Sequence, residues 1–294
     1  MAVGGHALSP TRRWGYFLSV IFLYAWPVAG AFEVQGAGAF SASMGHALST
    51  SVQSAESVWY NPATAARIGT ARVTATQALL WTGVGQSPTV HSLAGSWPQT
   101  WGTIALGYTG FRADGWNERG FLLGWSRGLS DRWAVGGLVK ANNWEAGRLS
   151  RGHWVSNVGV LYEAGWVTRK TYLRISGVAN NLGLSRKEDG RLTGQRPRSF
   201  TAGVQVVAKQ QLFALDFVRE ERGWEMRGGY QSELRAGLKL RIGTTVHIED
   251  TLNRIGHIGL GYEWKNIGFD YAFSHSYDLV GFGADHRFGV GYLW

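Results

Sequence analysis

The residues of this chain that could carry out covalent chemistry are few and poorly spaced for it. Ser274 and His275 are a candidate nucleophile and base, with Asp270 nearby in the sequence. Adjacent residues on an extended strand point to opposite faces, so these two do not make the hydrogen bond that activates a nucleophile. The run G-x-S-x-G at 124–128 falls inside a predicted strand, 120–129, and not on the strand-to-helix turn that exposes a catalytic serine. We therefore predict that the chain is not an enzyme.

Metal-ligating residues are equally sparse. The sequence has eight histidines and no cysteine, and no two histidines have the H-x-x-x-H spacing that places two ligands on one helical face. The run from His247 to Asp250 precedes a turn and is typical of a polar loop at a rim. We expect no metal and no cofactor.

Charged residues in the C-terminal half alternate with apolar ones, which places them on one face of extended strands. This face carries Asp216, Arg235, Lys239, Arg241, Glu263, Asp270 and Arg287. One hypothesis is an internal network of ion pairs, because buried charges must be paired. The other is a ligand site in which the basic side chains bind the carboxylate of a fatty acid-like molecule and apolar residues line its tail. This second hypothesis selects Arg235, Lys239, Arg241, Asp216 and Asp270 as candidate ligand-binding residues.

The elements that must position these charges are short strands separated by turn residues. We predict fourteen of them, an even number as in bacterial single-chain barrels, with lengths that suit a tilted span of a bilayer. The fold class is therefore an all-β, transmembrane, antiparallel β-barrel. The predicted strands are 71–82, 88–97, 102–111, 120–129, 132–143, 153–166, 171–180, 198–208, 211–219, 224–231, 233–242, 255–264, 267–274 and 286–294. Residues 112–119 and 185–196 are the longest polar connections that we expect.

The strand at the C-terminus is the most regular. Phe288, Val290, Tyr292 and Trp294 fall on one face, with small or polar residues on the other. A final strand of this kind, ending on an aromatic residue, resembles the C-terminal signal by which outer-membrane barrels are recognised by the barrel-assembly machinery.

The N-terminal residues have a different character. Arg12 and Arg13, an apolar run of about 15 residues and a small-x-small site at 29–31 predict a signal peptide over residues 1–31. Residues 32–68 are rich in small residues and contain an Asn-Pro turn, so this segment is not suited to form strands of the barrel wall. We expect this segment to lie in the mouth of a barrel formed by residues 69–294. Without cysteine, such a secreted chain is not a disulfide-stabilised module.

Several motifs resemble one family. The run Met44-Gly45, followed by Trp59 and by Asn61-Pro62-Ala63, resembles the N-terminal signature of FadL-like outer-membrane proteins, in particular their PorV/PorQ branch. Residues 176–183, 196–198, 270–273 and 286–288 resemble later strand ends of that family. The resemblance implies a fourteen-stranded barrel with an N-terminal plug that contains Met44, Gly45, Asn61, Pro62 and Ala63.

The resemblance leaves three functions open. FadL-like members pass hydrophobic small molecules such as fatty acids through the outer membrane, whereas the PorV branch assists type IX protein secretion; a purely structural envelope barrel is the third hypothesis. Transport predicts a continuous apolar pocket beside the plug and a kink or gap in the wall. The expected partners are outer-membrane lipid and lipopolysaccharide, together with hydrophobic molecules or secretion proteins. The formal net charge is +9, but the basic residues do not form a stripe along a helix, so we do not expect the chain to bind nucleic acid.

Overall fold

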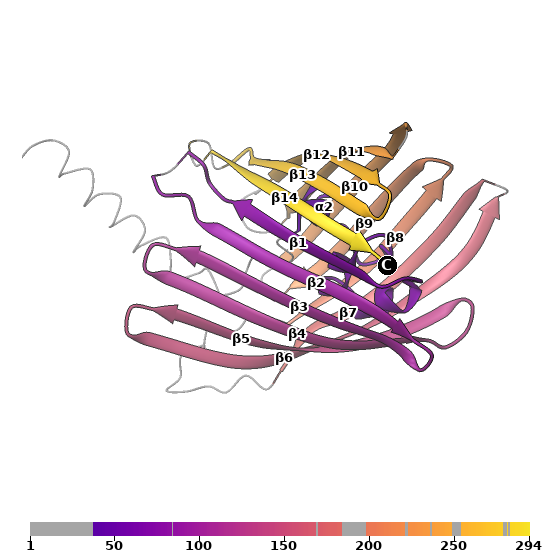
Figure 1. The fold of residues 1–294 in the computed structure, drawn as a ribbon, viewed down its shortest axis with the longest axis horizontal. Helices are drawn as coiled ribbons and strands as arrows, with labels where there is room; N and C mark the ends of the chain where they lie inside the picture. The colour runs from indigo at the N-terminus through magenta and orange to yellow at the C-terminus, as the bar shows by residue number, and fades with distance from the viewer. Residues whose placement is uncertain are drawn as a thin grey trace, which may run out of the picture.

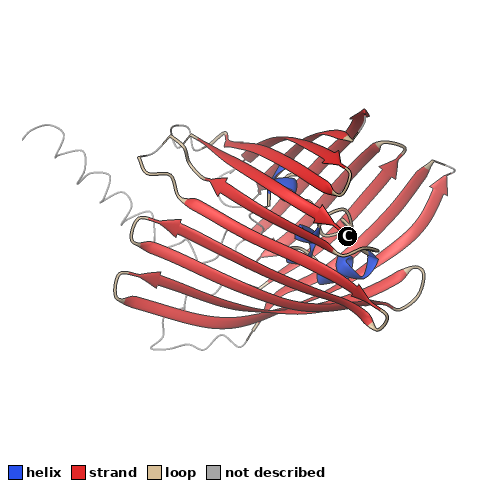
Figure 2. Ribbon diagram, viewed as in Figure 1, coloured by secondary structure: helices blue, strands red, loops and turns tan. Residues whose placement is uncertain are grey.

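The computed structural model shows a closed barrel of fourteen antiparallel strands (Figures 1 and 2). It describes residues 38–294 except 84, 169, 184–197, 221–222, 236, 249–253, 279–280 and 282. Each strand pairs with its neighbours in the sequence, and β1 closes the barrel on β14. The strands are β1 (Arg72–Leu79), β2 (Thr89–Gln99), β3 (Gly102–Ala113), β4 (Trp116–Gly128), β5 (Trp133–Ala146), β6 (Leu149–Thr168), β7 (Thr171–Leu182), β8 (Ser199–Ala208), β9 (Gln211–Glu220), β10 (Gly223–Arg235), β11 (Leu238–His247), β12 (Arg254–Trp264), β13 (Ile267–Ser276) and β14 (Ala284–Leu293).

Residues 38–68, which we call the plug, lie inside the barrel (Figure 2). They form α2 (Ala39–Ser43) and the two 3-10 helices η1 (Ala55–Trp59) and η2 (Pro62–Arg67). Side chains cap both short helices, because Ser54 accepts from the Glu56 amide and Asn61 accepts from the Ala63 amide. Pro62 at the first position of η2 lacks the N–H that would be unpaired there.

Side chains alternate across the wall as the period of a strand requires. In β14, Phe288, Val290 and Tyr292 are 41–54% exposed on the outer face, whereas Arg287 on the inner face is 5% exposed. The same separation holds in β9, where Asp216 is fully buried between exposed Phe213 and Phe217. The outer surface of the barrel is therefore apolar and the inner surface polar.

The two ends of the barrel differ in their connections. At the end where β14 finishes, the short-turn end, two-residue turns join β2 to β3, β8 to β9 and β12 to β13. Lys209 and Lys265 adopt positive φ of 56° there, as tight hairpins require. The opposite end, the long-loop end, has connections at 80–88 and 183–198. Exposed aromatic residues at the short-turn end include Trp101, Trp133, Trp166, Trp264 and Trp294.

The prediction of fourteen strands is confirmed, and two details of it are wrong. The predicted strand 233–242 is two elements, because β10 continues to Arg235 and a turn precedes β11 at Leu238. The predicted loop 112–119 is a two-residue turn, because β3 reaches Ala113 and β4 begins at Trp116. The predicted signal peptide, residues 32–37 and the loop 185–196 lie outside the described residues. None of the described helices is long and apolar enough to cross a membrane.

Candidate functional site

The plug is seated on glycines of the wall. Gly45 has a positive φ of 60°, and a side chain there would collide with the backbone of β10 and β11. In return, a Cβ on Gly229 would lie 2.5 Å from the Met44 carbonyl oxygen, and one on Gly243 would collide with Gly45. Met44 is also among the largest fully buried side chains. The first predicted plug motif therefore marks a backbone-to-backbone contact between plug and wall.

The second plug motif contacts the wall on the other side. The Asn61 Nδ2 donates to the Ser49 carbonyl at 2.7 Å and to the Val160 carbonyl at 3.2 Å, while its Oδ1 caps η2. Gly159 leaves room for this amide, because a Cβ there would collide with it. A Cβ on Gly136 would lie 2.6 Å from the Pro62 carbonyl carbon. Asn61 thus joins two parts of the plug to β6.

Asp216 holds the middle of the plug. Its carboxylate accepts from the Ser49 amide at 2.9 Å and from the Ser49 hydroxyl at 2.6 Å, and the same hydroxyl lies 2.7 Å from Ser176 Oγ. A Cβ on Gly203 would collide with these groups. A fully buried carboxylate is stable only when it is hydrogen-bonded in this way.

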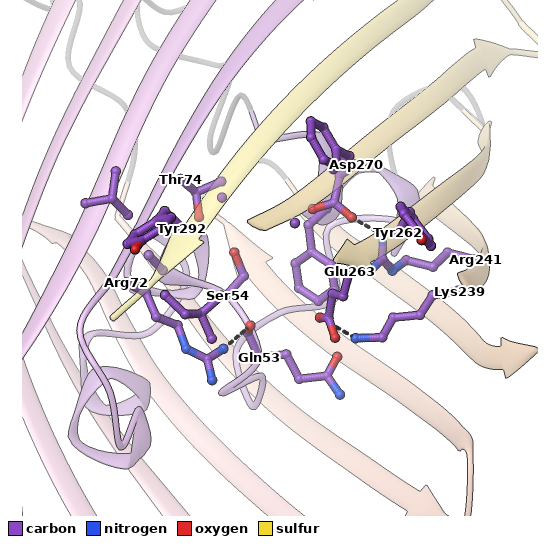
Figure 3. Close-up of a pocket in the computed structure, with 17 residues that line it drawn as sticks. Gln53, Ser54, Arg72, Thr74, Lys239, Arg241, Tyr262, Glu263, Asp270 and Tyr292 are labelled. Carbon is purple, nitrogen blue, oxygen red and sulfur yellow. Dashed lines mark hydrogen bonds and ion pairs between the residues drawn. The ribbon is translucent and has the colours of Figure 1, made fainter. Parts of the chain in front are cut away.

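Two ion pairs lie on β11, β12 and β13 beside α2 (Figure 3). Lys239 Nζ is 2.5 Å from Glu263 Oε1, and Arg241 Nη1 is 2.5 Å from Asp270 Oδ1. The Arg241 Nε also donates to Gln231 Oε1 at 2.7 Å. These pairs line a cavity of about 60 Å³, which is room for about two waters. The basic side chains are thus matched to carboxylates of the chain itself.

The guanidinium of Arg241 also lies over the ring of Phe40 in α2, 4.6 Å from its centroid. This contact connects the ion pair to the plug. The hypothesis of an internal ion-pair network therefore agrees with the placement of Lys239, Arg241 and Asp270.

Arg235 does not join these residues. It is exposed at the end of β10, next to the turn into β11, because the β-bulge between Glu233 and Arg235 changes the phase that the sequence alternation assumed. The predicted five-residue cluster is thus divided, since Asp216 contacts Ser49 of the plug and Arg235 lies outside the interior.

Glu56 is an interior carboxyl group that the sequence analysis did not select. Its Oε2 accepts from the Ser41 amide at 2.9 Å, and its Oε1 lies 3.5 Å from the Thr76 hydroxyl. Burial, helped by the negative charge of Asp270, raises the pKa of Glu56 from 4.5 to about 7, although Ser41 and Arg241 act in the opposite direction. It lies in η1 rather than in the alternating strands, so strand parity offered no signal for it.

Ser274 has a histidine partner, but not His275. His257 faces Ser274 across β12 and β13, and its Nδ1 lies 2.8 Å from the Ser274 hydroxyl. The Thr245 hydroxyl donates its single proton to the Gly45 carbonyl at 3.0 Å, so in its 3.2 Å contact with His257 Nε2 it is the acceptor. The proton of the neutral imidazole is therefore on Nε2, and Nδ1 accepts from the Ser274 hydroxyl. Both edges of the imidazole are therefore occupied in a chain of hydrogen bonds that ends on the plug. The register of β12 and β13 could have revealed this pair from the sequence.

The larger hollows lie on the outside of the wall. One of about 710 Å³ crosses β1 to β6 and is lined by residues such as Leu93, Leu123 and Trp154. Another of about 470 Å³ crosses β6 to β10. The apolar pocket that transport predicts beside the plug is not seen among the described residues near the ion pairs, where the cavity is small and polar.

The fold and its interior define a class: a closed, fourteen-stranded β-barrel with an internal plug. Solved structures with the same fold include two toluene transporters and a monoaromatic hydrocarbon channel. The Pseudomonas putida toluene transporter TodX has a TM-score of 0.64 at 12% identity, over 90% of this chain and 99% of that one. The Ralstonia pickettii toluene transporter TbuX has a TM-score of 0.61 at 12% identity, over 90% and 100% of the two chains. The CymD monoaromatic hydrocarbon channel has a TM-score of 0.60 at 12% identity, over 90% and 99%.

At this identity the likeness shows a shared fold. No protein-family model matches the chain, and a search of curated proteins found no match.

Proposed function

We propose that this chain is an outer-membrane channel for the passive passage of hydrophobic small molecules, of the FadL-like type. The fold shared with toluene transporters supports this, as do the apolar outer wall and its exposed aromatic residues. In this orientation the short-turn end faces the periplasm and the long-loop end faces outside. The plug fills the direct route through the barrel, so passage requires either movement of the plug or a route through the wall.

The observation that carries the proposal is the irregular seam between β6 and β7. Their pairing shifts register three times, between Ser156 and Val158, between Glu163 and Gly165, and between Trp166 and Thr168. The only other shift among the described strand pairs is a single one between β10 and β11. A seam with interrupted ladder hydrogen bonds opens at a lower cost in free energy than a regular one.

Polar side chains mark this seam on the inside. At the first shift, Asn157 of β6 lies opposite Asn180 and Asn181 of β7. The Asn157 Oδ1 accepts a hydrogen bond from the Asn181 backbone amide at 2.9 Å. Asn157 Nδ2 and Asn180 Oδ1 are buried and have no hydrogen-bond partner among the described residues. Unsatisfied amides destabilise a closed seam, typically by about 1–3 kcal/mol each. Outside the same seam lies the 470 Å³ hollow, which is suited to receive an apolar molecule.

The absence of cysteine allows a direct test of this route. Val158 and Ala179 face each other across the seam, so V158C/A179C gives a reversible disulfide between β6 and β7. Ile258 and Phe273 form a matched pair across the regular seam between β12 and β13. Uptake of labelled toluene and of a labelled fatty acid is measured in cells that lack other hydrophobic channels.

We expect the wild-type chain to accelerate uptake over the empty vector, V158C/A179C to block it until a reductant is added, and I258C/F273C to leave it unchanged. An uptake rate that neither disulfide changes would reject the lateral route but would still be consistent with transport. Equal uptake with and without the wild-type chain would reject transport itself.

A structural envelope barrel is the second candidate, and the paired interior charges favour it. Lys239 is paired with Glu263 and Arg241 with Asp270, so these basic side chains are neutralised by carboxylates of the chain itself. The secretion hypothesis requires a partner-binding rim, and residues 184–197, between β7 and β8, are outside the described residues. The PorV/PorQ branch therefore remains a sequence-based prediction.

A further inference from the structure

The hollow outside β6 to β10, which we call the outer groove, has a floor of small residues. Gly177 and Ala179 of β7 and Ala202 of β8 point outward, and a large side chain at these positions would fill the groove. Large side chains rise on both sides of this floor, so the wall is concave here rather than evenly curved. The walls of the groove are formed by Val158, Val160, Phe200, Phe217 and Trp224.

One basic residue lies at the long-loop end of this apolar groove. Arg219 continues the outward face of β9 beyond Phe217, and its register partners are Phe200 on β8 and Trp224 on β10. The Arg219 guanidinium carbon lies 5.2 Å from the Trp224 ring centroid, which holds the charge beside the groove. The long methylene stem of arginine extends the apolar lining, and the charged head lies at its rim.

This arrangement has the polarity of a membrane lipid. An acyl chain is apolar and narrow and fits a concave trough between aromatic side chains, whereas its phosphate needs a cation at the depth of the head groups. A second copy of the barrel would present a convex wall, which matches a trough poorly. The volume of about 470 Å³ is within the usual range of ligand sites, about 300–1,000 Å³.

We infer that the outer groove binds one acyl chain of a phosphate-bearing lipid, with the phosphate on Arg219. Because the proposed orientation places Arg219 in the outer leaflet, the lipid is the lipid A part of lipopolysaccharide. This inference rests on the proposed outer-membrane location, and its test below does not require that the chain transports anything.

The test is native mass spectrometry of the full-length protein in mild detergent, titrated with lipid A and with dephosphorylated lipid A. R219Q removes the charge and keeps the stem, and A202W fills the trough. R112Q is the matched control, because Arg112 is also exposed and outward-facing at the long-loop end, on β3, away from the groove. Insertion of each variant into lipid bilayers and its circular dichroism show that the barrel is intact.

We expect R219Q to weaken lipid A binding about fivefold, the contribution of one basic side chain beside an anionic lipid. A202W should abolish the tightest-bound lipid, R112Q should change nothing, and dephosphorylated lipid A should bind R219Q and the wild-type chain equally. Equal loss in R219Q and R112Q would overturn the inference, since it would show general surface attraction. If the wild-type chain forms dimers that A202W disrupts, while lipid A binding is unchanged, the groove binds a second copy of the chain and the inference is overturned. A wild-type chain that fails to insert into bilayers would instead reject the membrane location.

Discussion

Substitution of Asn61 by alanine should release the plug while leaving the barrel folded. Asn61 is fully buried and makes three hydrogen bonds, to the Ser49 carbonyl, to the Val160 carbonyl and from the Ala63 amide. The strands of the wall keep their own ladder hydrogen bonds without it. Loss of this side chain therefore weakens the contact between plug and wall more than it weakens the wall.

The magnitude follows from these contacts. An N-cap contributes about 1 kcal/mol, and each of the other two hydrogen bonds contributes about 1 kcal/mol. Two of the three hydrogen bonds lie within the plug, but its helices have only five or six residues and are too short to persist alone, so all three are lost on undocking. Docking of the plug should thus weaken by about 3 kcal/mol in N61A, which increases the undocked population roughly a hundredfold. N61S keeps a capping oxygen and loses the amide donor, so its loss should be about 2 kcal/mol.

The assay is hydrogen exchange of peptides from residues 38–68, compared with peptides from β12 to β14. We expect the plug amides to exchange much faster in N61A, the N61S amides at an intermediate rate, and the strand amides as in the wild-type protein. Because the interior is polar, N61A should also raise ion conductance in planar bilayers. Plug exchange that stays within twofold of the wild-type rate would refute the claim that Asn61 holds the plug.

Three further predictions concern the same interior. G159A should lower the melting temperature, because its methyl group collides with Asn61 and overpacking costs about 1–3 kcal/mol, whereas G268A should be neutral, since no atom lies within 4 Å of the added carbon. Burial raises the pKa of Glu56 to about 7, so docking of the plug should be most stable below pH 4.5 and weaken as the pH rises toward 7; E56Q should reduce this dependence in hydrogen-exchange experiments across that range. R241A should destabilise the barrel toward urea by about 1–3 kcal/mol, because it leaves the half-buried Asp270 without its cation, and R235A should change it by less than about 0.5 kcal/mol.

The alternation of side chains was sufficient to predict the barrel, because each strand must present one face to each environment. The outward positions of Phe288 and Phe213 and the inward positions of Asp216 and Arg241 all follow from this period of two. The error at Arg235 arises because the bulge at the end of β10 reverses its phase, whereas Lys239 and Arg241 on β11 keep the predicted phase. Nothing in the local sequence indicates the bulge.

Partners across the interior could not be predicted from the sequence. Asp216 and Ser49 are 167 residues apart, and nothing near either residue indicates the other. The polar residues of the region 112–119 predict a loop, although β3 and β4 continue through it up to a two-residue turn. Where strands extend beyond the apolar outer surface of the barrel, they carry polar residues on both faces, so their composition does not distinguish them from loops.

The wall glycines connect the fold to the proposed function. In a strand, glycine is usually a weakness, because it adds no side-chain packing. Here Gly136, Gly159, Gly203 and Gly243 each leave room for an atom of the plug, and a methyl group at any of them would push the plug away. The plug is therefore fitted to the wall by shape as well as by hydrogen bonds, and a molecule that crosses the barrel must displace this fitted contact or avoid it. The route that we propose through the seam between β6 and β7 leaves the contacts at Gly136 and Gly243 in place, and it requires movement beside Asn61, which is hydrogen-bonded to Val160 of β6.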